Sequence, residues 1–175
     1  MFEDPPTSPP HPSSDPWPQY AAAVVELVLD GEHLVLTPDD TTPAAEAGAL
    51  ARYGVPVWVL TAGDPYPVEL DAEQNAARNA RLRDELDALG VRHDPALGRS
   101  SDGSVSERSI AVRDADRATV LAAAARHGQL AVYEIDDRIR CIDVATGSMV
   151  SVRPYRLASA PAGSGRLVGP TGWEG

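Results

Sequence analysis

The chain has only two asparagines, Asn75 and Asn79, and they lie in a segment with helical periodicity. Three leucines continue the same stripe at spacings of three and four residues, namely Leu82, Leu86 and Leu89. Because the leucines must face a sheet, we expect both carboxamides to point inward at the start of the helix. A buried carboxamide without partners costs ~1–3 kcal/mol. We therefore expect the two amides to tie down the preceding turn, residues 61–65, or also to present groups to a ligand at the helix N-terminus, where the helix dipole favours an anion.

A carboxylate and a hydroxyl, Glu107 and Ser109, lie two residues apart and so share one face of a predicted strand. Glu107 could act there as a general base, or could bind a hard metal ion together with Asp64 and Asp102. The alternative is an exposed strand carboxylate paired with an arginine. His127 directly precedes a glycine, and is either a cation favoured by the dipole at a helix C-terminus or a catalytic base.

The elements that position these residues follow from the hydrophobic pattern. Residues 55–61 are apolar on both alternating faces, which predicts a central strand covered on both sides. Asp71, with Gln74 three residues later, forms a capping-box signal for a helix over about residues 72–89. Gly90 is a typical stop signal for that helix.

Two strands come next, with a turn at residues 101–104 between them, and the second covers residues 107–112. A helix over about residues 115–126 and a strand over residues 130–135 follow. The order is therefore strand-helix-strand-strand-helix-strand. It predicts an α+β fold, a ferredoxin-like split βαββαβ unit with both helices on one face of an antiparallel sheet.

Flanking β-hairpins are expected to extend this sheet. Asp30-Gly31 is a hairpin turn between strands over residues 24–29 and 33–36. The remaining predicted elements are a short helix over about residues 43–53 that ends at Gly54, a strand over residues 138–144 that forms a hairpin with the strand before it, and a short edge strand over residues 149–152.

The split βαββαβ topology predicts where the polar residues meet. The end of its first strand, the start of its first helix, the tip of its middle hairpin and the end of its second helix lie at one edge. In this chain, these places hold most of the uncommon polar residues of the folded part. We therefore predict one polar edge that contains the candidate ligand-binding residues Thr61, Asp64, Asn75, Asn79, Glu107, Ser109 and Gln129.

The composition excludes several kinds of chemistry. All 15 basic residues are arginine, so Schiff-base catalysis and a phosphate-loop lysine are excluded. The single cysteine, Cys141, excludes an internal disulfide and a thiolate zinc site, and its place in a predicted strand indicates packing. The four histidines are too scattered for a local metal-binding pair. We expect neither a cofactor nor a resident metal ion.

The formal net charge of −11 opposes non-specific binding to nucleic acid. No apolar run reaches the ~18 residues needed to cross a membrane, and the first residues do not resemble a signal peptide. We expect a cytoplasmic protein whose partner is a small molecule or another protein, and which could be a homo-oligomer.

Composition also suggests the domain boundaries. Residues 1–18 hold seven of the 16 prolines, which predicts an extended, disordered tail. Residues 158–175 hold five of the 14 glycines, which predicts a flexible tail. A single α+β domain is expected over residues 19–157.

Five short motifs carry a resemblance to a known family: residues 60–65, 73–82, 98–103, 107–109 and 128–133. Over about residues 57–135, their order and spacing resemble a small bacterial family, domain of unknown function 3293. The family pattern has Asn at the position of Asp64 and Trp at the position of Val105, so this chain lacks an amide donor and an aromatic side chain found there. The resemblance implies no reaction, because the family has no assigned activity.

Two functional hypotheses remain. The first is a non-catalytic binding or regulatory module that uses the polar edge: residues 61–65, Asn75, Glu107 and Gln129. The alternative is a hydrolase-type or metal-assisted enzyme that uses Asp64 and Glu107, with His127 as a further candidate. The lack of lysine, of a nucleophile–base pair and of metal-ligand spacing favours the first hypothesis.

Overall fold

The computed structural model describes residues 15–42 and 47–159. Within them, nine strands form one sheet in the order β8-β7-β6-β3-β5-β4-β1-β2-β9, and all neighbouring strands are antiparallel. The strands are β1 (Val24–Leu29), β2 (Glu32–Pro38), β3 (Val57–Leu60), β4 (Arg92–Arg99), β5 (Ser106–Arg113), β6 (Ala131–Ile135), β7 (Ile139–Asp143), β8 (Met149–Arg153) and β9 (Tyr155–Ser159). The helices are α1 (Trp17–Ala21), the 3-10 helix η1 (Ala47–Tyr53), α2 (Ala72–Ala88) and α3 (Arg117–Arg126).

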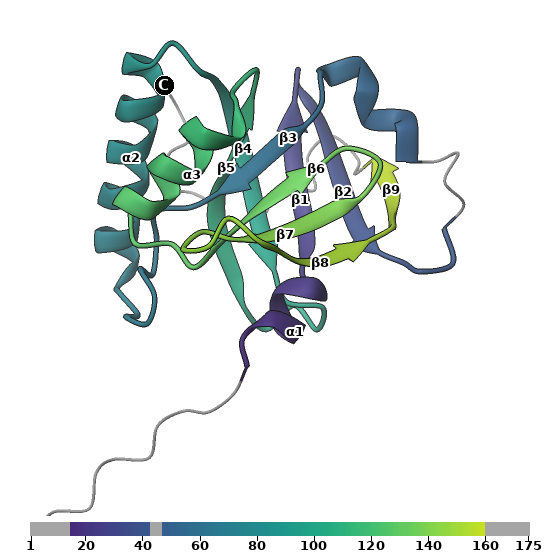
Figure 1. The fold of residues 1–175 in the computed structure, drawn as a ribbon, viewed down its shortest axis with the longest axis horizontal. Coiled ribbons are helices and arrows are strands. Elements are labelled where there is room, and N and C mark those ends of the chain that lie inside the picture. The colour runs from purple at the N-terminus through teal and green to yellow at the C-terminus, as the bar shows by residue number, and fades with distance from the viewer. Residues whose placement is uncertain (1–14, 43–46, 160–175) are drawn as a thin grey trace, which may run out of the picture.

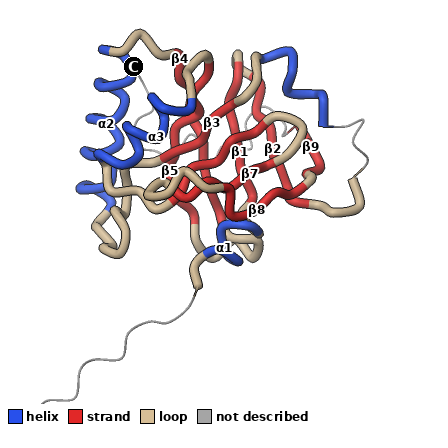
Figure 2. Tube along the Cα trace, viewed as in Figure 1, coloured by secondary structure: helices blue, strands red, loops and turns tan. Residues whose placement is uncertain are grey.

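The sheet curves into a nearly closed barrel, with α2 and α3 on one side of it (Figures 1 and 2). β8 and β9 occupy the two ends of the strand order, yet only Pro154 separates them in the chain. The two ends of the sheet are therefore held close together. The hydroxyl of Tyr155 on β9 also donates a hydrogen bond to the carbonyl of Asp136 after β6, at 2.6 Å.

The predicted α+β fold with a ferredoxin-like split sheet is wrong, because the nine strands form one mostly-β, nearly closed barrel. The hairpin of β1 and β2 pairs with β4, while β7 and β8 continue the sheet beyond β6. The central strand β3 needs cover on both faces, and here the barrel interior covers one face while helices cover the other. The strand β9 was not predicted, because it directly follows Pro154 and runs into residues 158–175, which were interpreted as a tail.

Two apolar cores lie on the two faces of the sheet. The inner core contains Val57 and Val59 of β3, and the outer core contains Trp58 and Leu60 of the same strand. α2 and α3 close the outer core with buried side chains: Leu82, Leu86, Val120, Ala123 and Ala124. Alternate residues of a strand therefore face the barrel interior, and the residues between them face the helices.

The local sequence signals have mixed outcomes. Asp30 and Gly31 both have positive φ, as a tight hairpin turn requires, and the capping box at Asp71 is present at the start of α2. The predicted edge strand over residues 149–152 is confirmed as β8. Leu89, expected to face the sheet, is 52 % exposed.

Some predicted ranges lie partly outside the described residues. The helix predicted over about residues 43–53 is a 3-10 helix in its described part, and residues 43–46 lie outside. The predicted tails lie mostly outside as well, although α1 begins within the first and β9 ends within the second. No helix in the described part of the chain combines the length and apolar character needed to cross a membrane.

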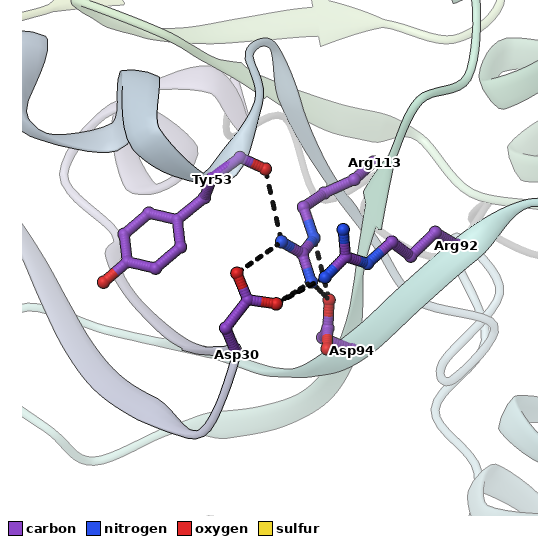
Figure 3. Close-up of polar contacts among 5 residues, drawn as sticks. All are labelled: Asp30, Tyr53, Arg92, Asp94 and Arg113. Carbon is purple, nitrogen blue, oxygen red and sulfur yellow. Dashed lines mark hydrogen bonds and ion pairs between the residues drawn. The ribbon is translucent and has the colours of Figure 1, made fainter.

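An ion cluster surrounds the buried Arg113 at one end of the barrel interior (Figure 3). Arg113 on β5 is 1 % exposed, and its Nε donates to Asp94 at 2.9 Å while its Nη2 donates to Asp30 at 3.0 Å. Its Nη1 also donates to the carbonyl of Tyr53 at 3.2 Å, and Arg92 adds a second cation beside Asp30. The hydrogen bonds from Arg113 hold the pKa of Asp30 below its usual value. The charge of Arg113 is therefore paired at this end of the interior.

Candidate functional site

The opposite end of the barrel interior holds a cavity of about 230 Å³. It lies where β3 ends and where β5 and β6 begin, and α1 lies across that end (Figure 1). The residues that matter most among its walls are Tyr20, Thr61, Glu107, Ser109, Gln129 and Tyr133. The cavity therefore has apolar and aromatic walls with a few polar groups, as is typical of small-molecule sites.

Strand alternation brings Glu107 and Ser109 into the cavity. Both precede Ala111 on β5 at two-residue spacing, and Ala111 belongs to the inner core. On β6, Ala131 and Tyr133 are likewise inner-core residues. The shared face that the sequence predicted for Glu107 and Ser109 is thus the inside of the barrel.

Glu107 is the carboxyl group among the described residues that line this cavity, and its pKa is strongly perturbed. Burial raises its pKa to about 7, the nearby charge of Asp64 adds to the rise, and hydrogen bonding with Thr61 opposes it. Within the described residues, Glu107 forms no ion pair, so the expected exposed carboxylate paired with an arginine is not found. A carboxyl group with this pKa exchanges its proton near neutral pH.

The loop after β3 begins at Thr61, and we call its residues 61–65 the rim of the cavity. Asn79 of α2 holds the first residues of this rim in place. The Asn79 carboxamide, 5 % exposed, accepts from Ala62 N–H at 2.8 Å and donates to the Arg108 carbonyl at 3.2 Å. The Thr61 hydroxyl donates to the same carbonyl at 2.9 Å and accepts from Gly63 N–H at 3.0 Å. Both side chains are buried, so here the two residues act mainly as structural links between the loop and β5.

Asn75 holds the next part of the loop. Its Oδ1 accepts from Asp64 N–H at 2.8 Å, and its Nδ2 donates to the Asp64 carboxylate at 2.9 Å. The same carboxylate accepts from Leu70 N–H at 2.8 Å. These bonds stabilise the positive φ of Asp64 and engage its carboxylate within the loop.

Gln129 and a glycine link the rim to the end of α3. The Gln129 Nε2 donates to the Gly63 carbonyl at 2.7 Å, and Tyr66 N–H donates to the Gly128 carbonyl at 3.0 Å. A Cβ on Gly63 would lie 3.2 Å from Asn75 Oδ1 and 3.3 Å from Glu107 Oε1. Glycine at position 63 therefore lets the rim pass between the helix amide and the buried acid.

The predicted meeting of Asn75 and Gln129 at one edge agrees with this geometry, because both contact the backbone of residues 63 and 64. Residues 60–132 match the family model described as Protein of unknown function (DUF3293). Residues 60–132 therefore correspond to a DUF3293 domain. Neither a curated protein nor a solved structure shows a significant match to the chain.

The DUF3293 match contains the rim and most of the cavity wall, but not the whole barrel. It runs from the end of β3 to the start of β6 and leaves β1, β2, β7, β8 and β9 outside. Tyr20 and Tyr133 of the cavity also lie outside the match. The cavity is thus completed by segments that the family model does not cover.

Two candidate residues do not join the site. The His127 ring contacts Glu85 of α2 at 3.1 Å, and His127 does not line the cavity. Asp102 accepts from Ser100 and Ser104 within its own turn, and these hydrogen bonds lower its pKa to about 2. No group of three or more acidic, histidine or cysteine residues in the described part of the chain could hold a metal ion. The suggested metal set of Asp64, Asp102 and Glu107 is therefore not assembled.

Three residues of the site were missed. Arg78 on α2 donates to the carbonyls of Ala62 at 2.6 Å and of His127 at 2.5 Å, and so joins the rim to the end of α3. The Tyr133 hydroxyl donates to the Tyr20 carbonyl at 2.9 Å, which attaches α1 to the barrel interior. The alternation of residues 131–135 could have placed Tyr133 inside, but nothing in the sequence links Tyr20 or Arg78 to this site.

Proposed function

We propose that this chain is a binding protein that holds a small molecule in the cavity at the α1 end of the barrel. The observation that carries the proposal is a partly buried carboxyl group, Glu107, without an ion partner in an otherwise mainly apolar cavity. A buried acid of this kind destabilises the fold unless a ligand or partner offsets the cost. The cavity of about 230 Å³ lies below the ~300–1,000 Å³ typical of drug-sized ligands, so a small ligand fits it better.

The polar groups around the cavity favour binding over catalysis. The side chain of Asp64, the other acid near Glu107, is engaged by Asn75 and by Leu70 N–H. Among the described residues that line the cavity there is no histidine or cysteine to serve as a nucleophile or a second base. The amides of Asn75 and Asn79 support the rim, while Gln129, Ser109 and Glu107 are left to meet a ligand.

A ligand screen tests the proposal. The first step is a thermal-shift screen with metabolites of different charge, since a ligand that binds the folded protein raises its melting temperature. Two-dimensional NMR then identifies the residues that each such ligand contacts. We expect ligands that perturb Ser109, Gln129 and Tyr133, and whose binding is weakened by Glu107→Gln. The matched control is Glu134→Gln, which removes one carboxylate outside the cavity. Ligands that bind only elsewhere, or that bind both variants equally, would contradict the proposal.

An enzyme is the second candidate function, because a pKa of about 7 suits Glu107 to general acid–base work at neutral pH. The two candidates differ in the fate of the bound molecule. Each ligand from the screen would be incubated with the protein and followed by NMR. An unchanged ligand supports the binding protein, whereas conversion that Glu107→Gln abolishes would establish the enzyme instead.

A further inference from the structure

We infer that the ligand of this cavity is a small organic cation, a protonated primary or secondary amine on an apolar body. The inference rests on the proposed function and names the chemical class that the same cavity binds. It follows from three features of the described residues: the hydrogen-bond acceptors on the cavity wall, the charges around Glu107, and the aromatic side chains beside it.

Several polar side chains of the wall present acceptor oxygens, because they donate a hydrogen elsewhere, and the cation of the wall, Arg99, is already paired with Glu26. Gln129 donates one of its two Nε2 hydrogens to the Gly63 carbonyl, and its Oε1 is an acceptor. The Ser109 hydroxyl donates to the Glu107 carbonyl at 3.3 Å, and the Thr61 hydroxyl donates to the Arg108 carbonyl. Together with the Glu107 carboxylate, these oxygens suit a ligand that brings several donors, and an ammonium group has up to three.

The charge balance also favours a cation. The buried acid on β1, Glu26, has two basic partners: Arg99 at 2.6 Å and His33 at 3.0 Å. The buried Arg113 has two acidic partners at the other end of the barrel. Glu107 has no such counter-charge within the described residues, and Asp64 adds negative charge nearby. A cationic ligand would supply the missing partner, and the net charge of −11 attracts cations to the protein.

The rest of the wall suits the body of such a ligand. Tyr20 and Tyr133 line the cavity beside Val59 and Ala131. Burial is the main cause of the raised pKa of both tyrosines, and the negative charge of Glu107 adds to it, which places their rings near the carboxylate. Aromatic faces attract cations within ~6 Å of the ring centre, so the rings can support the charged group as well as the apolar carbons.

Proton exchange at Glu107 gives the inference a distinctive pH dependence. An ammonium ion binds the ionised carboxylate, and about one tenth of Glu107 is ionised at pH 6 against about nine tenths at pH 8, if its pKa is about 7. The affinity for an amine should therefore rise about tenfold between these pH values. The other titratable or charged groups around the cavity are Asp64, Tyr20, Tyr66, Arg99, Tyr133 and Cys141.

The experiment compares probes that differ only in the charged group. We would use butylamine, 1-butanol and butyrate, and in parallel 2-phenylethylamine, 2-phenylethanol and phenylacetate. Each probe is titrated at pH 6 and pH 8 into the full chain and into the variants Glu107→Gln and Glu134→Gln, with NMR shifts of the cavity residues as the readout. Both amines stay protonated across this range, since alkylammonium groups have a pKa near ~10.

The expected result is binding of at least one amine in the cavity, about tenfold tighter at pH 8 than at pH 6, lost in Glu107→Gln and retained in Glu134→Gln. Equal or tighter binding of the alcohols or carboxylates in the cavity would overturn the inference while leaving the proposed function intact. Amine binding that Glu107→Gln does not weaken would also overturn it. If no probe of any charge moves the cavity resonances, the inference and the proposed function both fail.

Discussion

β5 carries one ionisable side chain at each end of the barrel interior, and the two have opposite surroundings. Arg113 is 1 % exposed and is held by two aspartates and a backbone carbonyl (Figure 3). Glu107 lies on the same inward face six residues earlier, roughly 20 Å away along an extended strand. It has no ion partner among the described residues and borders a cavity.

The difference separates a structural charge from a candidate functional one. At the Arg113 end, Asp30 comes from the β1–β2 turn and Asp94 from β4, so one guanidinium joins three parts of the chain. At the Glu107 end, the hydrogen bonds stabilise the rim and leave the carboxyl group itself without a counter-charge. A perturbed acid in a cavity marks a functional-site candidate, whereas a fully paired ion marks a support of the fold.

The largest expected effect is at the Arg113 end. Arg113→Met should lower the free energy of unfolding by about 3 kcal/mol, because Asp30 and Asp94 lose their shared cation and the Tyr53 carbonyl loses a donor. The estimate lies at the low end for buried pairs because both carboxylates remain partly exposed. Urea unfolding at pH 7 measures it.

The control for this prediction is Arg126→Met, which removes an exposed arginine paired with Glu85. Its effect should stay below about 1 kcal/mol. Equal losses in the two variants would mean that the Arg113 cluster is no more structural than a surface pair.

The next effect concerns the rim at the Glu107 end. Asn79→Ala should cost about 2 kcal/mol, because Ala62 N–H loses its buried acceptor and the Arg108 carbonyl loses a donor. Asn75→Ala should cost about 1 kcal/mol, since Asn75 and the Asp64 turn are partly exposed to water. Chemical unfolding of both variants provides the test. The reverse order would show that Asn75, not Asn79, is the main support of the rim.

Substitution of Glu107 should have a smaller effect, and it should raise rather than lower the free energy of unfolding. The pKa of Glu107 is higher in the folded protein than in the unfolded chain, so ionisation of Glu107 destabilises the fold. The folded protein keeps its full stability below about pH 4.5, where Glu107 is protonated in both states, and loses this contribution as the pH rises through about 7. Glu107→Gln removes this loss, so the variant should be more stable than the parent by about 1.5 kcal/mol at pH 8, a value reduced for partial exposure. At pH 5 the gain should fall to about a quarter of this value.

Urea unfolding at the two pH values measures this linkage, with Glu134→Gln as the charge-matched control. A gain that is the same at pH 5 and pH 8, or a loss of stability at pH 8, would contradict the unpaired state of Glu107.

The smallest effect concerns the packed interior between the two ends. Cys141 on β7 is 1 % exposed, and burial raises the pKa of its thiol to about 12. We expect the native protein not to react with a thiol reagent at pH 8, while the urea-unfolded protein reacts at once. Rapid reaction of the native protein would show that the cavity extends into the middle of the barrel and that the two ends are less distinct than described.

Much of the local structure could be predicted because its signals are local. The Asp30-Gly31 turn, the capping box at Asp71 and the apolar strand β3 each depend on a few neighbouring residues. Barrel closure depends on pairing between β2 and β9, more than 100 residues apart in sequence, and no local pattern specifies it. The flanking hairpins were predicted, but their part in closing the sheet was not.

In the candidate site, too, the features with local sequence signals could be predicted and those that depend on long-range contacts could not. The period-two alternation placed Glu107 and Ser109 on one face, and the helical stripe placed Asn75 and Asn79 near the loop after β3. Whether the shared face of Glu107 borders bulk solvent or a cavity depends on the barrel, so its raised pKa was not predictable. The contacts of Arg78 with backbone carbonyls 16 and 49 residues away have no sequence signal either.

The most direct test of this comparison is a carboxyl ¹³C NMR titration of Glu107 in the ligand-free protein, with the signal assigned by its loss in Glu107→Gln. The partly buried carboxyl group without an ion partner described above should titrate with a midpoint at about pH 7. A midpoint near the usual value of about 4.5 would mean that Glu107 is solvated or paired like an ordinary surface acid, and the proposed site would lose its basis.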